Sequence, residues 1–313
     1  MHSTPSLVFS LGLLLPLFHP ATAWGSLGHR TVAYLASTYF TAESTRMTNQ
    51  LLHGQDISEA ALFPDKVRHM PQFAYTRGWH YIDAQDAPPQ QCGINMTRDC
   101  ALGGGCVVSA IANHTARVAD PALPPALRGQ SLRFMMHFFG DVHQPLHTEA
   151  EDRGGNEYAV LFDGRHTNLH SVWDTLIPNK YAGPGHHGDD DDDDDEFAAA
   201  WLWAHQLSDA ATAAEEGKGE GECLHDAAAC ALSWAGEANS YVCSYVLAHD
   251  VHNQDLGGAY YDGAVPVINH LVQKAGRRLA AWINAISVNY TPSHHHVVEA
   301  DLDVEQARIL QIQ

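Results

Sequence analysis

Apolar residues recur at the three- and four-residue spacing of an amphipathic helix in six stretches of the chain. We predict these stretches to be helices: Thr31–Phe40, Cys106–Val118, Pro125–Val142, Phe197–Ala214, Asp226–Leu247 and Ala264–Ile286. Pro124 and Pro125 stand at the start of the third stretch, where proline suits the first turn, and Pro145 follows its end. The pattern is typical of a mainly α-helical protein.

One short segment favours a β-strand instead. Residues Glu157–Phe162 end at Asp163-Gly164, a dipeptide typical of a tight hairpin turn. Two glycine-rich breaks, Gly103–Gly105 and Gly154–Gly155, lie between predicted helices. No internal repeat is visible, and no linker divides the chain into two globular units. We therefore expect a mainly α, single-domain fold with one short β-hairpin.

The first 23 residues, 1–23, are predicted to be a secretory signal peptide. An apolar run from Leu7 to Phe18 is followed by Ala21–Ala23, the small-residue pattern of a cleavage site, although no Lys or Arg precedes the run. The run is too short to span a bilayer, and Pro16 and Pro20 disfavour a buried helix.

The mature chain would begin at Trp24, with residues 24–290 as the folded domain and 291–313 as a polar C-terminal tail. No second apolar stretch approaches the length of a membrane anchor. The sequence therefore predicts a soluble protein of the secretory pathway, either secreted or retained in a secretory compartment.

The charge composition excludes some ways in which the protein could bind its partners. The 313 residues include 17 Lys and Arg against 37 Asp and Glu, a formal charge of −20, and 45% of them are hydrophobic. The hydrophobic content excludes wholesale disorder, and the acidic balance excludes a basic surface for polyanions. The 22 His outnumber Lys and Arg together. If the protein handles phosphate, positive charge must come from bound metal ions.

An acidic run occupies Asp189–Asp195, is extended by Glu196 and lies in a predicted loop insertion at 184–196. We interpret it as a solvated, self-repelling loop, because a cation site would need an ordered cage that the sequence does not indicate. The three consecutive residues His294–His296 are interpreted as part of the tail in the same way.

The six cysteines agree with a secretory compartment, where an even number of Cys suggests disulfide bonds. Six Cys allow 15 pairings, and none of them forms the C-x-x-C pattern of a zinc knuckle. Three Asn-x-Thr triplets, at Asn95, Asn113 and Asn289, are candidate glycosylation sites.

The strongest chemical signal is a repeated spacing of His and Asp. His137 and Asp141 are four residues apart, so on a helix they share one face and can bind one metal ion. His170 and Asp174 repeat the spacing, and His147 follows the first pair closely. One such pair is commonly a surface hydrogen bond, but two pairs with a further His indicate a site. Imidazole and carboxylate without thiolate suit zinc.

These residues lie within a longer series of motifs. In chain order the motifs are Trp24–Arg30 (WGSLGHR), Asp65–Arg68 (DKVR), Trp79–Asp83 (WHYID), His137–His147 (HFFGDVHQPLH), Gly154–Asn156 (GGN), Asn168–Asp174 (NLHSVWD) and Ala275–Ala280 (AGRRLA). The series resembles the zinc-dependent class I nucleases, the single-strand-specific nucleases and 3′-nucleotidases of fungi, plants and trypanosomatids. The resemblance covers nearly the whole mature chain and implies the helical fold of the zinc phospholipase C and class I nuclease type.

The resemblance implies a cofactor of three Zn²⁺ ions. Its ligand sets would be Asp65, His80, His137 and Asp141 for one ion, the Trp24 α-amine and carbonyl with His29 and the shared Asp141 for its neighbour, and His147, His170 and Asp174 for the third. His143 lies within a motif but is not a ligand in the family. The family's disulfides suggest Cys92–Cys243 and Cys100–Cys106, which leaves Cys223 and Cys230 to pair with each other.

The resemblance also implies hydrolysis of phosphoesters. Asp65 would orient the attacking water, and Arg68 would stabilise charge on the phosphoryl oxygens. The alternative for Arg68 is a salt bridge to Asp65 with no catalytic part. Tyr81 would stack on a nucleobase, Asp83 would bind its edge, and Asn156 would be a neighbouring contact. Such a site requires an unpaired base.

The expected substrates are single-stranded DNA and RNA, hydrolysed to 5′-nucleotides, and 3′-nucleotides, which lose their phosphate. The acidic surface should favour short oligonucleotides and 3′-mononucleotides over long nucleic acid. No stable protein partner is implied. Two alternatives are a phospholipase C-like phosphodiesterase, disfavoured by Tyr81 and Asp83, and a secreted zinc-sequestering protein, disfavoured by Arg68.

Overall fold

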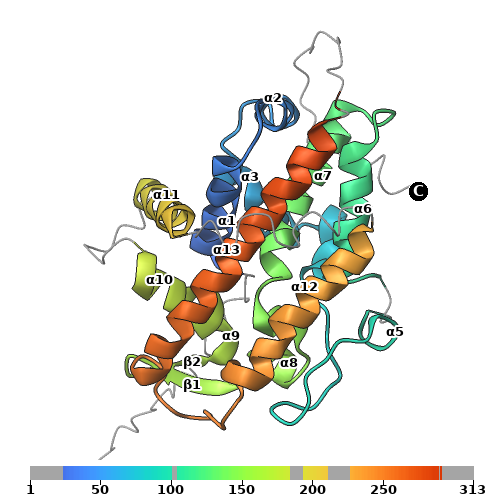
Figure 1. Ribbon diagram of the computed structural model, residues 1–313. Helices are drawn as coiled ribbons and strands as arrows, with labels where there is room; N and C mark the ends of the chain where they lie inside the picture. The colour runs from blue at the N-terminus through green and yellow to red at the C-terminus, as the bar shows by residue number, and fades with distance from the viewer. Residues whose placement is uncertain (1–23, 101–103, 184–192, 211–225, 289, 291–313) are drawn as a thin grey trace, which may run out of the picture.

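The structure, a computed structural model, describes residues 24–100, 104–183, 193–210, 226–288 and 290. Over these residues the protein is mainly helical, and its two strands form one hairpin (Figure 1). The longer helices are α1 (Ser26–Thr38), α2 (Ala42–Leu51), α6 (Val107–Ala119), α7 (Pro125–Asp141), α11 (Asp193–Asp209), α12 (Ala227–Tyr241) and α13 (Ala259–Ser287).

Short helices and turns connect these elements. The short α-helices are α3 (Ile57–Ala61), α4 (Phe63–Val67), α5 (Met96–Asp99), α8 (Asp152–Gly155), α9 (Leu169–Ser171) and α10 (Ile177–Ala182). Two 3₁₀ segments span Pro71–His80 and Pro145–Thr148, and two π turns span Val172–Leu176 and Val242–Val246.

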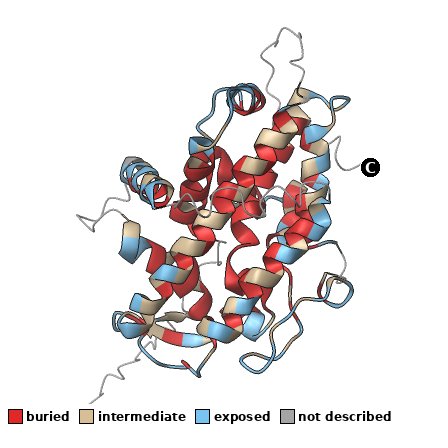
Figure 2. Ribbon diagram, viewed as in Figure 1, coloured by how far each residue is buried: buried red, intermediate tan, exposed pale blue. Residues whose placement is uncertain are grey.

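Helix α7 lies in the middle of the molecule, where it packs against α6 and α13 (Figure 1). Its second half is buried on every side, as expected for a helix at the centre of a core. Figure 2 shows the buried residues concentrated on α7 and on the inner faces of the helices around it. Because His137 and Asp141 lie in this half, the core itself holds two predicted metal ligands in place.

The predicted hairpin is present. Strand β1 (Ala159–Phe162) pairs antiparallel with β2 (Arg165–Asn168), and the pairs run from Ala159 with Asn168 to Phe162 with Arg165. Asp163 and Gly164 form the turn with φ values of 49° and 77°, the left-handed conformation that such a tight turn requires. The side chain of Asn168 then accepts a hydrogen bond from the Ser171 amide at 2.7 Å. The hairpin therefore leads directly into the helix that carries His170.

The predicted boundaries of three helices were wrong. Helix α1 begins at Ser26 rather than Thr31, since Gly28 packs on Trp24 inside the helix, and a Cβ at Gly28 would lie 2.8 Å from the Trp24 Cβ. Helix α13 begins at Ala259 rather than Ala264 and accommodates Pro266 in its interior. Helix α11 begins at Asp193 rather than Phe197.

The start of α11 also corrects the prediction of an acidic loop over 184–196, of which 184–192 lie outside the described residues. Carboxylates in the first turn of a helix interact favourably with its dipole. Glu196 accepts hydrogen bonds from Ser26 at 2.6 Å and from Arg30 at 2.7 Å, so it attaches α11 to α1. Glu196 is therefore an ion-pair partner of Arg30 rather than a solvated charge.

The disulfides Cys92–Cys243 and Cys100–Cys106 are present. Cys230 is disulfide-bonded too, whereas Cys223 lies outside the described residues. Asn95 and Asn113 are exposed, and Asn289, the signal segment and the His-rich tail also lie outside the described residues. Within the part of the chain that the structure describes, no helix combines the length and apolar character needed to cross a bilayer.

Candidate metal centre

Different elements bring the predicted ligand side chains together. His29 comes from α1, Asp65 from α4, His80 from the end of the first 3₁₀ segment, His137 and Asp141 from α7, His147 from the second 3₁₀ segment, His170 from α9 and Asp174 from the π turn after it. They form three groups whose ligand atoms lie within 4.8 Å of one another: His29, His137 and Asp141; Asp65, His80 and His137; and His147, His170 and Asp174.

The ligand atoms of Asp65, His80, His137 and Asp141 lie close enough together to contact one metal ion. Nδ1 of His80 lies 3.0 Å from Oδ2 of Asp141 and 3.1 Å from Nε2 of His137. Oδ1 of Asp65 lies 3.8 Å from the His80 nitrogen and 3.7 Å from the His137 nitrogen. Ligands at about 2.0–2.1 Å from a tetrahedral zinc are roughly 3.4 Å apart, so these atoms fit one ion.

Asp141 connects this group with His29. Its Oδ1 lies 3.2 Å from Nε2 of His29, whereas its Oδ2 is the oxygen near His80 and His137. Trp24 is fully buried next to His29, and the amide of Gly25 donates to the carbonyl of Asp174 at 2.7 Å. The backbone at Trp24 is therefore anchored beside the third group.

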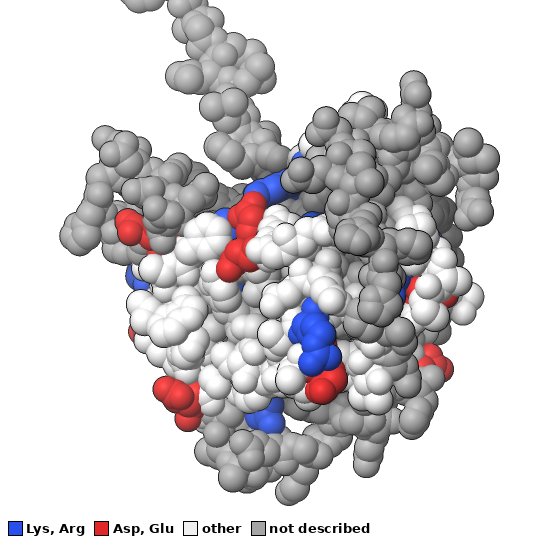
Figure 3. All heavy atoms as spheres, turned by 90° about the horizontal axis from the view of Figure 1, so that it is seen from above, with Lys and Arg blue, Asp and Glu red and all other residues white. Residues whose placement is uncertain are grey.

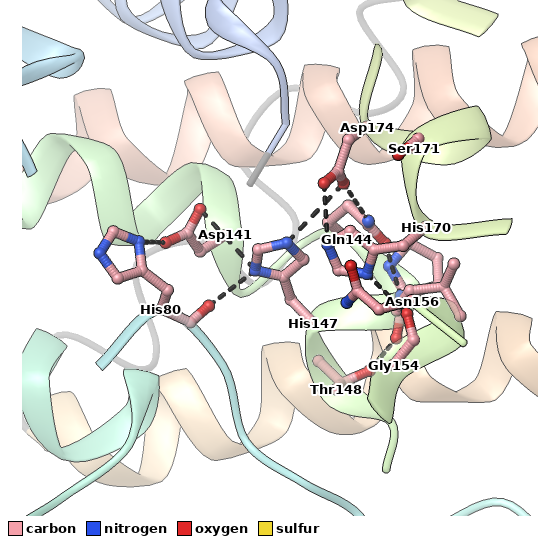
Figure 4. Close-up of polar contacts among 12 residues, drawn as sticks. His80, Asp141, Gln144, His147, Thr148, Gly154, Asn156, His170, Ser171 and Asp174 are labelled. Atoms are coloured by element: carbon pink, nitrogen blue, oxygen red, sulfur yellow. Dashed lines mark hydrogen bonds and ion pairs between the residues drawn. The ribbon is translucent and has the colours of Figure 1, made fainter. Parts of the chain in front are cut away.

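The third group lies on the other side of Asp141. Nε2 of His170 is 2.8 Å from Oδ2 of Asp174, and Nε2 of His147 is 3.7 Å from its Oδ1. The rings of the two histidines stack with centroids 5.0 Å apart. Figure 4 shows Asp141 between His80 and His147, and Asp174 beside His147, His170 and Gln144.

Backbone carbonyls fix the orientation of three imidazoles. Nδ1 of His137 donates to Ala61 O at 2.8 Å, Nδ1 of His147 to His80 O at 2.7 Å, and Nδ1 of His170 to Gly154 O at 2.6 Å. A carbonyl can only accept, so Nδ1 carries the proton and Nε2 keeps its lone pair directed into the group. This is the arrangement by which metal-binding histidines are normally held.

Several buried atoms of the groups have no hydrogen-bond partner: Nε2 of His29, Oδ1 of Asp65, Oδ1 of Asp141 and Nε2 of His147. Buried polar atoms are almost always paired, because an unpaired one costs free energy of desolvation. Coordination of metal ions would satisfy these atoms together. The donor set and its unpaired atoms therefore fit a cluster of metal ions.

In the two groups that contain Asp65 and Asp141, burial and like charge shift pKa values away from the charged forms, whereas in the third group the Asp174–His170 pair favours charge: it raises the pKa of His170 and lowers that of Asp174 to about 2. Burial raises the pKa of Asp65 to about 7, and burial with the neighbouring carboxylates Asp65 and Asp174 raises that of Asp141. Burial lowers the pKa of His137 to about 3 and that of His29 well below its usual value. Neutral imidazoles bind metal, and clustered carboxylates are stabilised by cations, so the shifts at His29, Asp65, His137 and Asp141 agree with bound cations.

Two glycines allow the close approach of the ligands. A Cβ at Gly140 would lie 2.7 Å from Nδ1 of His29, and one at Gly154 would lie 2.6 Å from the Leu146 carbonyl oxygen. Gly154 also has φ of 63°, a conformation that side chains disfavour. These positions explain why the glycines of two sequence motifs are needed.

A cavity of about 320 Å³ opens beside the groups. His80, His147 and His170 line it, and so do Arg68, Tyr81, Asp83 and Asn156, the residues predicted to contact substrate. Tyr81 is 41% exposed, so its ring is accessible from the cavity. Nη1 of Arg68 lies 3.4 Å from Oδ1 of Asp65, which is the salt bridge considered as the alternative role of Arg68.

Sequence reasoning missed several residues of this site. Gln144 donates to Oδ1 of Asp174 and accepts from the Leu146 amide, and Arg153 and Glu149 line the cavity. Gln144 belongs to the motif His137–His147, but its spacing from the neighbouring residues does not identify it as a residue of the site. His143 bonds to Phe139 O and to Arg278, away from the three groups. A further group, Asp86, Cys92 and Glu149, offers no thiolate because Cys92 is in a disulfide.

Figure 3 shows Lys and Arg on the face seen there as separate small groups beside Asp and Glu. Among the residues described on that face, no broad basic patch is present.

Comparison with known proteins identifies the family. The S1/P1 nuclease family model matches residues 24–287. The chain is 38% identical to nuclease P1 of Penicillium citrinum over 274 residues, covering 84% of this chain and 97% of that protein. It is 37% identical to nuclease S1 of Aspergillus oryzae over 277 residues, covering 84% and 92%, and 28% identical to endonuclease 4 of Arabidopsis thaliana over 290 residues, covering 88% and 92%. The chain therefore belongs to the S1/P1 nuclease family of nucleic-acid-hydrolysing enzymes.

Proposed function

We propose that the protein is a zinc-dependent phosphoesterase that hydrolyses single-stranded DNA and RNA to 5′-nucleotides and removes phosphate from 3′-nucleotides. The observation that carries this proposal is the juxtaposition of three His/Asp groups with a cavity lined by Arg68, Tyr81 and Asp83. The disulfides support a location in the secretory pathway, where such bonds persist.

Three Zn²⁺ ions would be held by the ligand sets that the groups suggest. Asp65, His80, His137 and Asp141 would bind the first, His29, Asp141 and the amine and carbonyl of a mature N-terminal Trp24 the second, and His147, His170 and Asp174 the third. Zinc supplies Lewis acidity: it makes water a stronger acid and offsets the negative charge of phosphate oxygens.

The protein's own residues would position the reactants. The free lone pairs of the Asp65 carboxylate can accept a proton from the attacking water and orient it. Arg68 lies at the same edge of the cavity, and its planar guanidinium suits two phosphoryl oxygens. The Asp65–Arg68 pair is compatible with this role because it holds both side chains where the phosphate would lie.

The other end of the cavity would bind the nucleobase. The exposed face of Tyr81 would stack on the base, and Asp83 and Asn156 would bind polar groups near it. A base paired within a duplex cannot present its face and its edge to such a site. The protein would therefore prefer single-stranded substrates.

Two alternatives predict different behaviour. A phospholipase C-like phosphodiesterase would hydrolyse lipid head groups, but Tyr81 and Asp83 favour a base as the ligand. A zinc-sequestering protein would need no substrate cavity and no Arg68 within it, whereas both are present here.

The test is phosphate release from 3′-AMP and from 5′-AMP, with denatured and duplex DNA as a second pair. We expect release from 3′-AMP alone and faster hydrolysis of denatured DNA. Hydrolysis of a phosphatidylcholine head group without hydrolysis of 3′-AMP would support the first alternative. Zinc binding without any hydrolysis would support the second, and equal rates on both forms of DNA would exclude the base-stacking role of Tyr81.

A further inference from the structure

The cavity is bordered on one side by four consecutive residues with left-handed backbone conformations. The φ values are 46° for Asp152, 57° for Arg153, 63° for Gly154 and 76° for Gly155. Two of the four residues are not glycine, so the turn is strained. Strained backbone persists where the surroundings fix it, and it is concentrated at binding and catalytic sites.

The surroundings fix this turn firmly. Gly154 O accepts from Nδ1 of the metal-ligand candidate His170 at 2.6 Å, and the Gly155 amide donates to Glu151 O at 2.9 Å. The side-chain amide of Asn156 donates to Arg153 O at 2.8 Å. The backbone of Arg153 is therefore held in a constant position relative to the metal centre.

The side chain of Arg153, by contrast, is available. It lines the cavity but is 79% exposed, and its ion-pair partner among the described residues is Glu157, whose Oε1 lies 3.1 Å from Nη1. Glu157 is itself 59% exposed, and a salt bridge between exposed groups contributes little. Arg153 can therefore exchange Glu157 for another anion at small cost and still has further N–H donors to offer.

The position of Arg153 indicates which anion it would meet. Among the described residues that line the cavity, Arg68 and Arg153 are the arginines, and Arg68 is 12% exposed beside Asp65 whereas Arg153 is at the rim. A nucleotide with its base at Tyr81 and its 3′-phosphate near Arg68 and the metal ligands has one other anionic group, the 5′-phosphate. The 5′-phosphate leaves the sugar on the side opposite the reacting group, toward the rim.

We propose that Arg153 binds the 5′-phosphate of the nucleotide whose 3′-phosphate lies at the metal centre. The inference rests on the proposed function and adds a preference to it. Nucleotides that carry a 5′-phosphate, including every internal nucleotide of a strand, are bound better than nucleotides that end in a 5′-hydroxyl. Arg153 thus partly offsets the repulsion between a chain of formal charge −20 and nucleic acid.

Two small molecules test this directly, because adenosine 3′,5′-bisphosphate and adenosine 3′-monophosphate differ only in the 5′-phosphate. The quantity to measure is the ratio of kcat/KM for release of the 3′-phosphate from the two compounds, at low and at high salt. For the unaltered protein we expect a ratio of roughly ten at low salt, the effect of one charge-assisted hydrogen bond, and a smaller ratio at high salt.

Four variants identify the source of the preference. Arg153→Gln should bring the ratio close to one, and Arg153→Lys should keep most of it, since a phosphate needs the charge. Glu157→Gln should raise the ratio because it removes the competing carboxylate. Arg46→Gln on α2, which contributes no residue to the cavity, is the charge-matched control and should leave the ratio unchanged.

Several outcomes would overturn the proposal. A ratio near one for the unaltered protein would do so, and so would equal effects of Arg153→Gln and Arg46→Gln. If Arg153→Gln keeps the kcat/KM ratio and Arg153→Lys loses it, the positive charge does not recognise the 5′-phosphate, and the planar end of the side chain stacks on the base instead. If the unaltered protein releases phosphate from neither compound, the proposed function fails and this inference fails with it, whereas hydrolysis of both at similar rates overturns this inference alone.

Discussion

The two carboxylate oxygens of Asp141 face different histidines. Oδ1 is 3.2 Å from His29, and Oδ2 is 3.0 Å from His80 and 3.4 Å from His137. The side chain is fully buried at the end of α7, so it cannot rotate away without disturbing the core. A carboxylate in this position can bridge two cations, which an amide of the same shape cannot do as well because it offers one oxygen and no charge.

We expect Asp141→Asn to lose the two neighbouring zinc ions and at least about a thousandfold in kcat, because one charge and one bridging oxygen disappear together. Zinc analysis of the purified variant, beside phosphate release from 3′-AMP, measures both effects. Asp262→Asn, an exposed position on α13, is the control for loss of a carboxylate. Normal zinc content in Asp141→Asn would contradict the bridging role.

The predicted N-terminal ligand can be tested by adding one residue. An α-amine has a reference pKa of about 7.7–8.0 and binds zinc once deprotonated, whereas the nitrogen of an amide is non-basic. A chain that begins with Gly ahead of Trp24 should therefore bind about two zinc ions instead of three and hydrolyse 3′-AMP far more slowly. Equal zinc content and equal rates for chains beginning at Trp24 and at the added Gly would exclude Trp24 as a ligand.

Among the elements, sequence periodicity found six of the seven longer helices and the hairpin because each carries its signal locally, but it missed α2. The pattern of α7 is continuous, and Asp163-Gly164 fixes the hairpin turn. The early start of α1 was missed because it depends on packing between Gly28 and Trp24, which periodicity does not report.

The sequence likewise pointed to some of the side chains that line the candidate site and not to others. His-x₃-Asp spacing indicated two pairs, and the family motifs supplied the other candidate ligands; the structure brings the His and Asp side chains among them close together. Arg153 and Gln144 could not be predicted, since the first depends on a strained turn and the second on contact with Asp174 from a distant element. Long-range pairings of this kind follow from the fold and not from local sequence.

An ion-pair network joins α12 to α13. Glu237 on α12 pairs with Lys274 and, at 2.7 Å, with Arg278 on α13, and Arg278 also donates to His143 at 2.8 Å. Burial raises the pKa of Glu237, but the hydrogen bond and charge of Lys274 and those of Arg278 outweigh it and lower the pKa to about 2. A lowered pKa in the folded state means that the ionised carboxylate stabilises the fold.

Glu237→Gln should therefore lower the free energy of unfolding by about 1 kcal/mol at neutral pH, a value reduced by partial exposure. The stabilisation by Glu237 is complete above its unfolded-state pKa of about 4.5 and is lost as the pH falls toward its folded-state pKa of about 2. Urea unfolding of the metal-free protein and variant across this range should show the difference shrinking. A difference that stays constant down to pH 2 would contradict the ion-pair account.

At the scale of the whole molecule, the ligand groups join parts of the chain that are far apart in sequence. Candidate ligands from α1, α4, α7 and α9 lie together in the core. They are surrounded by buried residues of the helices that pack around α7 (Figure 2). Metal ions bound there would therefore stabilise the folded state in addition to supporting the reaction.

Removal of metal with a chelator should lower the Tm, by roughly ten degrees or more if the ions bind tightly, and the Tm should recover when zinc is added. Without the ions, the carboxylates of Asp65 and Asp141 remain buried next to each other with unpaired atoms. Differential scanning fluorimetry of treated and untreated protein measures this, and magnesium serves as the control ion. An unchanged Tm after complete removal of zinc would show that the ions do not connect these elements.

Zinc dependence of the hydrolysis is tested most directly by returning zinc stepwise to the chelated mature protein while following phosphate release from 3′-AMP and counting bound zinc. We expect no release without zinc and a rate that becomes maximal as the three groups fill, at about three ions per chain. 5′-AMP should give no release at any stage. A full rate of release from 3′-AMP in the zinc-free protein would contradict a zinc-dependent mechanism.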